Sequence, residues 1–299
     1  MRMTIAPPSP PSTAEILALR PPKNVVDPRR PYAFLAEKER SAEGELVDVA
    51  TVFLTNRECP FRCLMCDLWK NTTDHPISSG DIPTQIDFAL ARLGPARHIK
   101  LYNSGNFFDR KAIPPSDYVA IARRLAGFER VVVENHPKLC DDRVLRFRDL
   151  LDGELEVALG LETAHPEVLK RLNKSMTLED FSRAAEFLRL EGIAVRAFIL
   201  LRPPFLSEEG GVEWAIRSIV FAFDAGVECC SVIPTRAGNG AMEVLEQQGL
   251  FEPPTVESME TVLAEGIRMR RGRVLMDLWE VQNSPRRDRL ERMNLLQEI

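Results

Sequence analysis

Residues 59–66 read Cys59-Pro60-Phe61-Arg62-Cys63-Leu64-Met65-Cys66, a C-x3-C-x2-C spacing that closely follows the apolar run Ala50–Thr55. Three thiolates in one short loop can converge on a single inorganic centre without ligands from the rest of the chain. Structural zinc would take a fourth Cys or His, and His75 and His98 lack finger-like spacing. An iron–sulfur cubane on three cysteines leaves one iron open, and an open iron can bind and reduce a small molecule directly. The loop therefore favours an iron–sulfur cluster over zinc.

Outward from this loop, short apolar runs alternate with amphipathic segments from Val47 to near the end of the chain. This alternation predicts βα units, with the apolar runs as parallel strands and the longer segments as crossover helices. The predicted strands are Ala50–Thr55, His98–Tyr102, Val131–Glu134, Leu155–Gly160, Val195–Leu201 and Glu228–Ile233, with a seventh at Val274–Leu278. The predicted helices are Thr84–Leu93, Ser116–Ala126, Asp141–Asp149, Thr177–Glu191, Glu208–Ala225 and Thr255–Met269.

Residue types at the ends of these segments agree with the prediction. Ser116 and Thr177 are favourable helix caps, and Gly192 and Gly226 stop the helices that they follow. Six βα units with right-handed crossovers form a parallel sheet with helices outside, as an open sheet or as a partial or full barrel. In each of these folds, the chemistry belongs at the carboxyl ends of the strands.

The chain divides into three predicted segments. Residues 1–46 form a proline-rich leader and N-terminal extension, residues 47–235 form the βα core, and residues 236–299 form a C-terminal extension that covers or closes the barrel. The first thirty residues contain seven prolines and one short apolar stretch, Ala14–Leu19. We therefore expect an extended, partly ordered leader.

The composition is that of an ordinary soluble globular chain, with 299 residues, 44% of them hydrophobic and 28% charged, and a net charge of −5. The longest apolar run, Ile193–Leu201, is interrupted by Arg196 and is far shorter than the roughly 18–20 residues of a membrane span. With no signal-peptide pattern, the sequence predicts a cytoplasmic protein with no membrane partner. Six cysteines are too few for a disulfide scaffold. The negative net charge argues against a surface built throughout for nucleic acid, and leaves a local basic groove open.

The cysteine loop is similar to the signature of radical S-adenosylmethionine (SAM) enzymes. The resemblance implies a 4Fe-4S cluster on Cys59, Cys63 and Cys66, whose open iron chelates the amino and carboxylate groups of SAM. It also implies that SAM is cleaved reductively to methionine and a 5′-deoxyadenosyl radical that abstracts hydrogen from a substrate, with a flavodoxin- or ferredoxin-like electron donor. Met65 departs from the aromatic residue that usually precedes the third cysteine; the resemblance implies that this position contacts adenine largely through its backbone.

Groups suited to SAM also follow the second and third predicted strands. Asn103, Ser104, Gly105 and Asn106 stand where the family often has a Gly-Gly-Glu run that meets the SAM amino group. Gly105 keeps the flexibility, and Asn103 or Asn106 could replace the missing acid as an acceptor; a plain βα turn is the alternative. Glu134 ends the third strand, where it could accept hydrogen bonds from an ammonium group or ribose hydroxyls, or form a salt bridge.

The fourth predicted βα unit resembles one branch of this superfamily more than the others. Residues 157–174 are similar to the coproporphyrinogen dehydrogenase and elongator catalytic subunit branch, in which the position that matches Glu162 contacts SAM. Arg202 follows the fifth strand, where that branch commonly has Gly-Leu-Pro, and could bind a carboxylate or phosphate of SAM or substrate, or lie on the surface. The resemblance spans residues 50–235. It implies a partial (β/α)6 barrel of the radical SAM type with N- and C-terminal extensions, and it leaves the catalytic residues unidentified.

The remaining cysteines show no spacing for a second cluster. Cys229 and Cys230 share a strand and face opposite sides, so we expect both of them, and Cys140, to be ordinary structural residues. His136 and His165 stand near strand ends, where they could approach substrate or cap a turn.

The C-terminal part raises the question of nucleic acid. The loop Pro234–Gly240 could line the active-site mouth or face solvent. Arginines gather further on, at Arg268, Arg270, Arg271, Arg273, Arg286, Arg287, Arg289 and Arg292. Family members that modify tRNA use such tails on the phosphate backbone, and the layout is similar to the radical SAM partner in archaeosine tRNA synthesis; interleaved acidic residues favour a solvated helix. The substrate stays open between a small molecule and a modified tRNA base. The alternative function is a zinc-stabilised α/β module that binds RNA or protein without SAM chemistry.

Overall fold

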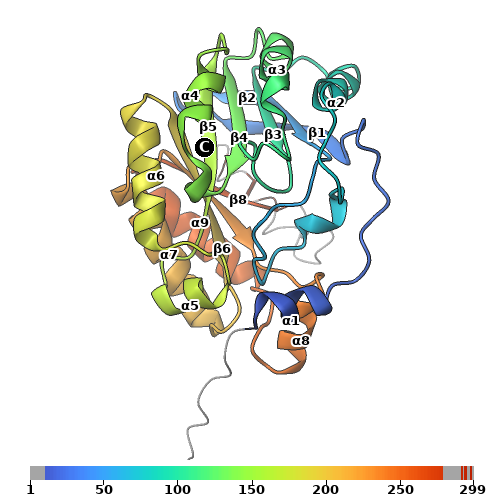
Figure 1. Cartoon of the computed structure of the whole chain (residues 1–299). Coiled ribbons are helices and arrows are strands. Elements are labelled where there is room, and N and C mark those ends of the chain that lie inside the picture. The colour runs from blue at the N-terminus through green and yellow to red at the C-terminus, as the bar shows by residue number, and fades with distance from the viewer. Residues whose placement is uncertain (1–10, 279–290, 292, 295–296, 298–299) are drawn as a thin grey trace, which may run out of the picture.

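The computed structural model describes residues 11–278, together with residues 291, 293, 294 and 297. The described residues form one sheet, with strands in chain order: β1 (Ala33–Arg40), β2 (Leu46–Phe53), β3 (His98–Tyr102), β4 (Arg130–Asn135), β5 (Glu154–Glu162), β6 (Ala194–Leu201), β7 (Cys229–Pro234) and β8 (Arg273–Met276). β1 is antiparallel to β2, and each later neighbouring pair is parallel. The sheet curves into a half-barrel with helices along its outer side (Figure 1). This is the partial barrel that the sequence predicts.

Helices connect the strands as expected for βα units. They are α2 (Asp81–Leu90), α3 (Tyr118–Arg124), α4 (Asp142–Arg148), α5 (Pro166–Arg171), α6 (Leu178–Leu190), α7 (Glu208–Asp224), α8 (Ala241–Gln247) and α9 (Val256–Arg268), with α1 (Thr13–Ala18) ahead of β1 and 3-10 turns η1 (Leu68–Asn71), η2 (Pro115–Asp117) and η3 (Pro137–Leu139). The six predicted helices are confirmed as α2, α3, α4, α6, α7 and α9. No described helix is long and apolar enough to cross a membrane.

Helix ends follow the predicted caps with one exception. The side chain of Thr177 caps α6, and Gly192 and Gly226 end their helices with φ angles of 69° and 85°, a region that glycine adopts freely. The predicted cap at Ser116 is wrong, because the 3-10 turn η2 precedes α3 and places Asp117 at the cap position.

The part of the leader that the structure describes contains one short helix that the sequence does not predict. Residues 13–18 form α1, which Ser12 begins with a capping box to Glu15. Ile16 is buried in this short helix, whereas its neighbour Leu17 is exposed. Six residues are too few for helical periodicity to be recognised from the sequence.

β1 is not among the predicted strands. Its second half reads Glu37-Lys38-Glu39-Arg40 and lacks the apolar alternation of a half-buried strand. Glu39 is nevertheless buried, because it points into the half-barrel and meets basic side chains of other strands. This edge of the half-barrel is therefore held by ionic contacts as well as by apolar ones.

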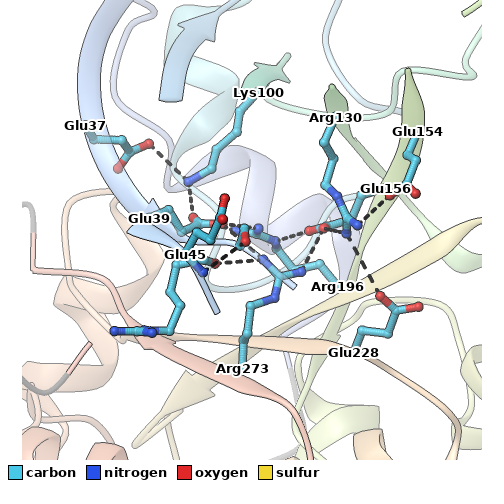
Figure 2. Close-up of polar contacts among 12 residues, drawn as sticks. Glu37, Glu39, Glu45, Lys100, Arg130, Glu154, Glu156, Arg196, Glu228 and Arg273 are labelled. Atoms are coloured by element: carbon cyan, nitrogen blue, oxygen red, sulfur yellow. Dashed lines mark hydrogen bonds and ion pairs between the residues drawn. The ribbon is translucent and has the colours of Figure 1, made fainter. Parts of the chain in front are cut away.

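Near the amino ends of the strands, the inner face of the sheet carries a cluster of charges (Figure 2). This interior ion network consists of Glu39, Lys100, Arg130, Glu156, Arg196 and Arg273. Arg196 stands at its centre, because its guanidinium meets a Glu39 oxygen and a Glu156 oxygen at 2.5 Å each. The side chains of Arg196 and Glu156 are 2% and 0% exposed, so both charges are paired out of contact with water.

Pairing keeps these buried groups ionised. Burial alone would raise the pKa of Glu156, but Arg196 and Arg273 lower it to about 2. Arg130 reaches Glu156 from β4 at 3.0 Å, and Arg273 reaches it from β8 at 3.0 Å. The interior ion network thus links strands on both sides of the half-barrel and forms a polar floor beneath the carboxyl ends of the strands.

Aromatic rings lie next along the same inner face. Phe198 follows Arg196 by two residues on β6, so the two side chains share a face. The ring centroid of Phe198 lies 5.7 Å from that of Tyr102. The Tyr102 centroid lies 6.0 Å from that of Phe53, and the Phe53 centroid lies 5.6 Å from that of Tyr32. All four rings are partly exposed. They form an aromatic layer between the ionic floor and the carboxyl edge of the sheet.

The interior ion network makes a prediction about stability. Substituting Arg196→Met leaves two buried carboxylates short of a partner, so we expect the free energy of unfolding to fall by about 3–5 kcal/mol. Arg217→Met is the matched control, since Arg217 pairs with Glu213 at 2.6 Å on the exposed side of α7, and its loss should cost about 0.5 kcal/mol or less. Urea denaturation measures both; equal losses would contradict the role of the network.

Candidate functional site

The cysteine loop leaves the carboxyl end of β2 and returns at η1. The segment after α5 holds its middle: the Leu64 amide donates to the Leu172 carbonyl at 2.9 Å, and the Asn173 side chain donates to the Arg62 carbonyl at 2.8 Å. From the loop after β7, the Asn239 side chain donates to the Leu64 carbonyl at 2.7 Å. Segments that follow β5 and β7 therefore fix the loop that the sequence singles out.

The three cysteines are partly buried, and their thiols are close enough to affect one another. Burial raises the pKa of Cys59 and that of Cys63, the latter to about 12; it also raises the pKa of Cys66, to which Cys63 and Cys59 contribute. Within the described ranges, no three His, Cys, Asp or Glu side chains stand close enough to hold one metal ion. Three thiolate donors in one loop fit a cubane cluster that leaves one iron open.

Residues 103–106 follow β3 and pack against the first cysteine. A Cβ on Gly105 would lie 3.3 Å from Cys59 Cβ, so the absence of a side chain permits this close approach. The Asn106 side-chain nitrogen donates to Cys59 Sγ at 3.0 Å, and the Ser104 hydroxyl donates to the Tyr32 hydroxyl oxygen at 2.9 Å. The structure thus brings together the first cysteine and the turn predicted to meet SAM.

Glu134 holds this turn from the neighbouring strand. Its Oε1 accepts from the backbone amides of Asn103 and Gly105, at 2.5 Å and 3.2 Å. Burial raises the pKa of Glu134 to about 7, although these amides oppose the shift. Asn103 Oδ1 is buried and has no hydrogen-bond partner among the residues that the structure describes. A buried acceptor without a donor is costly, so this oxygen suits a donor group of a bound ligand.

Glu162 ends β5 in a left-handed conformation with φ of 64°, at a bulge in the β5–β6 pairing. Its Oε1 meets Lys174 Nζ at 2.6 Å, and the two side chains are 11% and 8% exposed. Gly160 leaves room for the pair, because a Cβ there would lie 2.5 Å from both groups. Burial alone would lower the pKa of Lys174, but Glu162 and Cys63 raise it. A buried ion pair thus stands beside the thiols.

Lys174 is a site residue that the sequence predictions omit. Lys174 is the last residue of the stretch 157–174. In the sequence, the feature that could have indicated it is a basic residue directly after Asn173. Its importance follows from the fold, because the chain between Glu162 and Lys174 forms α5 and turns back toward β5. Sequence spacing alone does not show that return.

His136 caps a turn and also supports the cysteine loop. Its Nδ1 accepts from the Lys138 amide at 3.2 Å, and its Nε2 meets the Lys174 carbonyl at 3.0 Å. Burial and the charge of Lys174 lower the pKa of His136 to about 3, so the imidazole is neutral and Nε2 carries the proton that it donates. Phe61 of the cysteine loop stacks on this ring, with centroids 3.7 Å apart. Of the two roles predicted for His136, the role as a cap of a turn is confirmed.

Met65 and Arg202 lie at the margin of the site. Met65 packs between an apolar cluster around α8 and a second one around Leu200. The Arg202 guanidinium meets Glu208 at 2.5 Å and Glu252 at 2.6 Å. The structure therefore places the charge of Arg202 against α7 and the segment after α8, apart from the group formed by the cysteines, residues 103–106, Glu134 and Glu162.

Residues 12–24, which we call the N-terminal strap, cover the cysteine loop from outside. α1 lies beside α8, although the two helices are far apart in the sequence (Figure 1). Ile16 belongs to an apolar cluster that includes Leu64 of the cysteine loop and Met242 of α8. Gly240 lets the strap pass, because a Cβ there would lie 1.8 Å from the Leu19 carbonyl oxygen.

The second half of the strap is held by charge. Arg20 and Lys23 meet Glu58, the residue before the first cysteine, at 2.7 Å and 2.8 Å. The Arg20 guanidinium also lies 4.5 Å from the centre of the Trp69 ring. The Asn24 amide donates to the Lys70 carbonyl at 2.9 Å. The N-terminal strap therefore holds residues on both sides of the three cysteines.

The other cysteines lie elsewhere. Cys230 packs in the hydrophobic core, whereas Cys229 faces the interior ion network. Burial raises the pKa of Cys229, although Arg196 and Arg273 oppose the shift. Cys140 follows η3 and lies 3.5 Å from the side-chain nitrogen of Asn135. The opposite orientation predicted for the two neighbours on β7 is confirmed.

The C-terminal arginines that the structure describes lie away from the cysteine loop. Arg271 pairs with Asp224 at 2.8 Å, and Arg268 pairs with Glu265. Residues 270 and 271 precede β8, so they lie at the amino edge of the parallel sheet, opposite the edge that carries the cysteines. Four of the arginines lie outside the described residues: Arg286, Arg287, Arg289 and Arg292.

Comparison with known proteins identifies one family. The model of the Radical SAM superfamily matches residues 53–209, which is more than half of the chain. The matched residues run from the end of β2 into α7 and include the three cysteines of the loop, Glu134, Glu162 and Lys174.

Individual relatives extend the comparison. An uncharacterized protein of Methanocaldococcus jannaschii is 24% identical over 259 residues, which cover 81% of this chain and 71% of that protein. Archaeosine synthase subunit beta of Methanosarcina acetivorans is 30% identical over 215 residues; the match covers 68% of this chain and spans 61% of the subunit. The structure of Streptococcus suis SuiB bound to S-adenosylmethionine has a TM-score of 0.55 at 11% identity, covering 74% of this chain and 48% of SuiB, a likeness of fold.

The N-terminal strap gives a test that needs no cofactor. Ile16→Asp puts a charge into the apolar cover of the cysteine loop, and Leu17→Asp, at a neighbour that is 44% exposed, is the control. In cluster-free protein we expect Ile16→Asp to speed labelling of Cys63 and Cys66 by at least about tenfold, which corresponds to about 1.4 kcal/mol of local stability. Thiol labelling followed by peptide mass mapping measures the rates. Equal rates in both variants would show that the strap does not protect the thiols.

Proposed function

The chain belongs to the radical SAM superfamily and is an enzyme that uses a 4Fe-4S cluster and SAM, and on that premise we propose that Cys59, Cys63 and Cys66 hold the cluster. The observation that carries the proposal is the grouping of three partly buried cysteines next to an unpaired acceptor, Asn103 Oδ1, and the Glu162–Lys174 pair. When bound, the cluster supplies the electron that cleaves SAM to methionine and a 5′-deoxyadenosyl radical, the species that abstracts hydrogen from a substrate. An external electron donor is required, for which we propose a flavodoxin- or ferredoxin-like protein.

The residues around the thiols have distinct proposed roles. Asn103 Oδ1 accepts a hydrogen bond from the SAM amino group, and Lys174, which pairs with Glu162, offers its charge to the SAM carboxylate. Glu134 positions residues 103–105, because its carboxylate already accepts from their backbone amides. Met65 offers its backbone to adenine. Arg202 would have to leave two carboxylates to reach SAM, so we leave it out of the site.

The cysteines can be tested against a matched thiol. Cys66→Ala should abolish the brown colour, the absorbance near the violet edge of the visible and the release of 5′-deoxyadenosine, because the cluster loses one of three ligands. Cys140→Ala should leave all three unchanged, since Cys140 lies outside the cysteine loop. Anaerobic purification, absorbance spectroscopy and product analysis under reduction with SAM provide the readouts. Colourless parental protein with stoichiometric zinc would instead support the zinc-stabilised binding module.

For the substrate, we propose a nucleobase carried by tRNA. The matched archaeosine synthase subunit beta of Methanosarcina acetivorans is 30% identical over 68% of this chain, which supports a tRNA substrate. The aromatic layer supports a base, because partly exposed rings offer stacking surfaces for a nucleobase turned out of its helix. Its position between the ionic floor and the cysteines is where a hydrogen-abstracting centre could reach the base.

A tRNA backbone would meet the carboxyl edge of the sheet. Lys138 and Lys170 are exposed there and line a surface cavity of about 730 Å³, together with Asn173, whose side chain holds the cysteine loop. Arg270 and Arg271 are exposed at the opposite edge. The geometry therefore favours the two lysines over the arginines as phosphate contacts.

This placement predicts opposite outcomes for two charge reversals. The double variant Lys138→Glu/Lys170→Glu should weaken binding of unmodified tRNA by about tenfold or more and lower the salt slope by about two. Arg270→Glu/Arg271→Glu should leave both unchanged, and both variants should keep uncoupled SAM cleavage. Fluorescence anisotropy at several salt concentrations measures the tRNA affinity and its salt slope for both variants. A larger loss in the arginine variant, or no tRNA binding by the parental enzyme, would contradict the proposal.

A further inference from the structure

Asn106 makes a contact that the roles above do not use. It follows β3 by four residues, and it is 3% exposed. Its side-chain nitrogen stands 3.0 Å from Cys59 Sγ, on the side of the cysteine loop that faces β3. The backbone fixes the residue, because the Asp109 amide donates to the Asn106 carbonyl at 3.1 Å and Gly105 packs against Cys59 Cβ. The side-chain amide thus points at one sulfur from a turn that is held in place by these contacts.

A donor at this sulfur has an electrical consequence when the cluster is bound. One-electron reduction adds a negative charge that is spread over the irons and their sulfur ligands, and an N–H group that points at a ligand sulfur stabilises the more negative state. Hydrogen bonds to the sulfurs and solvent exposure are among the terms that set the potentials of iron–sulfur clusters. Asn106 is buried, so its hydrogen bond acts in surroundings poor in water.

We propose that Asn106 is a positioning residue that raises the reduction potential of the cluster, through the hydrogen bond from its side chain to Cys59 Sγ. The inference rests on the proposed role of Cys59 as a cluster ligand. It assigns to Asn106 a role toward the cluster in addition to the acceptor role toward SAM that the sequence predicts. The step affected is the transfer of one electron from the external donor to the oxidised cluster, which the hydrogen bond makes more favourable.

The protein contains a second asparagine–cysteine contact, between Asn135 and Cys140, that should not affect the reduction potential of the cluster. Asn135, at the end of the next strand, also points its side-chain nitrogen at a cysteine sulfur, that of Cys140, at 3.5 Å. Asn135 is as buried as Asn106. Cys140 lies outside the cysteine loop, so loss of its amide contact should leave the potential of the cluster unchanged. The pair separates an electrical effect from the general cost of replacing a buried asparagine.

The test is a redox titration of the cluster in the whole chain, followed by electron paramagnetic resonance after anaerobic reconstitution and iron analysis. Asn106→Leu keeps the approximate volume and removes the donor, so its midpoint potential should shift to a more negative value. Asn106→Asp replaces the donor by a negative acceptor and should shift it further in the same direction. Asn106→Gln keeps an amide and should restore part of the shift, whereas Asn135→Leu should match the parental protein.

The outcomes separate this inference from the proposal on which it rests. Parental protein that binds no cluster contradicts the proposed function. If the parental protein binds a cluster and both Asn106→Leu and Asn106→Asp have the parental midpoint potential, the inference is contradicted while the proposed function stands. Should Asn106→Leu fail to retain iron, Asn106→Asp decides the direction by itself. An equal negative shift in Asn135→Leu also overturns the assignment, because it would trace the shift to packing rather than to the hydrogen bond at Cys59.

Discussion

Partial burial of three cysteines in one short loop is the constraint on which the rest of this site depends. A loop of eight residues cannot bury its own cysteines, so the cover comes from elsewhere: the N-terminal strap, the loop after β7 and the segment after α5. These three pieces come from distant parts of the sequence, and each contacts the backbone or the apolar side chains of the loop. The sulfurs remain available to a cluster while the loop stays in place.

The inner face of the half-barrel is organised in layers by charge. Paired ions fill the amino end, around Arg196; aromatic rings follow, around Tyr102; and the cysteines and the Glu162–Lys174 pair stand at the carboxyl edge. Each layer suits its position. The ion network closes one end with rigid contacts between strands, and the aromatic layer offers a surface for a planar substrate. Lys174 supplies positive charge where negative groups would gather.

Much of the fold could be predicted from the sequence, because βα units are recognisable by apolar runs and helical periodicity. The predicted bounds of β3 and α7 agree with the structure to within one residue. The prediction missed β1 because that strand buries Glu39, and burial of a charge becomes sensible only when Arg196 and Lys100 are present across the interior. The cysteines and the turn at 103–106 could be found from spacing. Lys174, Tyr32 and the strap could not, since their contacts with the site depend on how the chain returns in space.

The central claim is that a cluster on Cys59, Cys63 and Cys66 has an open iron that binds SAM. The most direct test is electron–nuclear double resonance on the reduced, reconstituted enzyme mixed with SAM that carries ¹⁵N in its amino group or ¹⁷O in its carboxylate. The account predicts hyperfine coupling of both labels to the cluster, because both groups bind the open iron. A reconstituted cluster that shows no coupling to either label would contradict it.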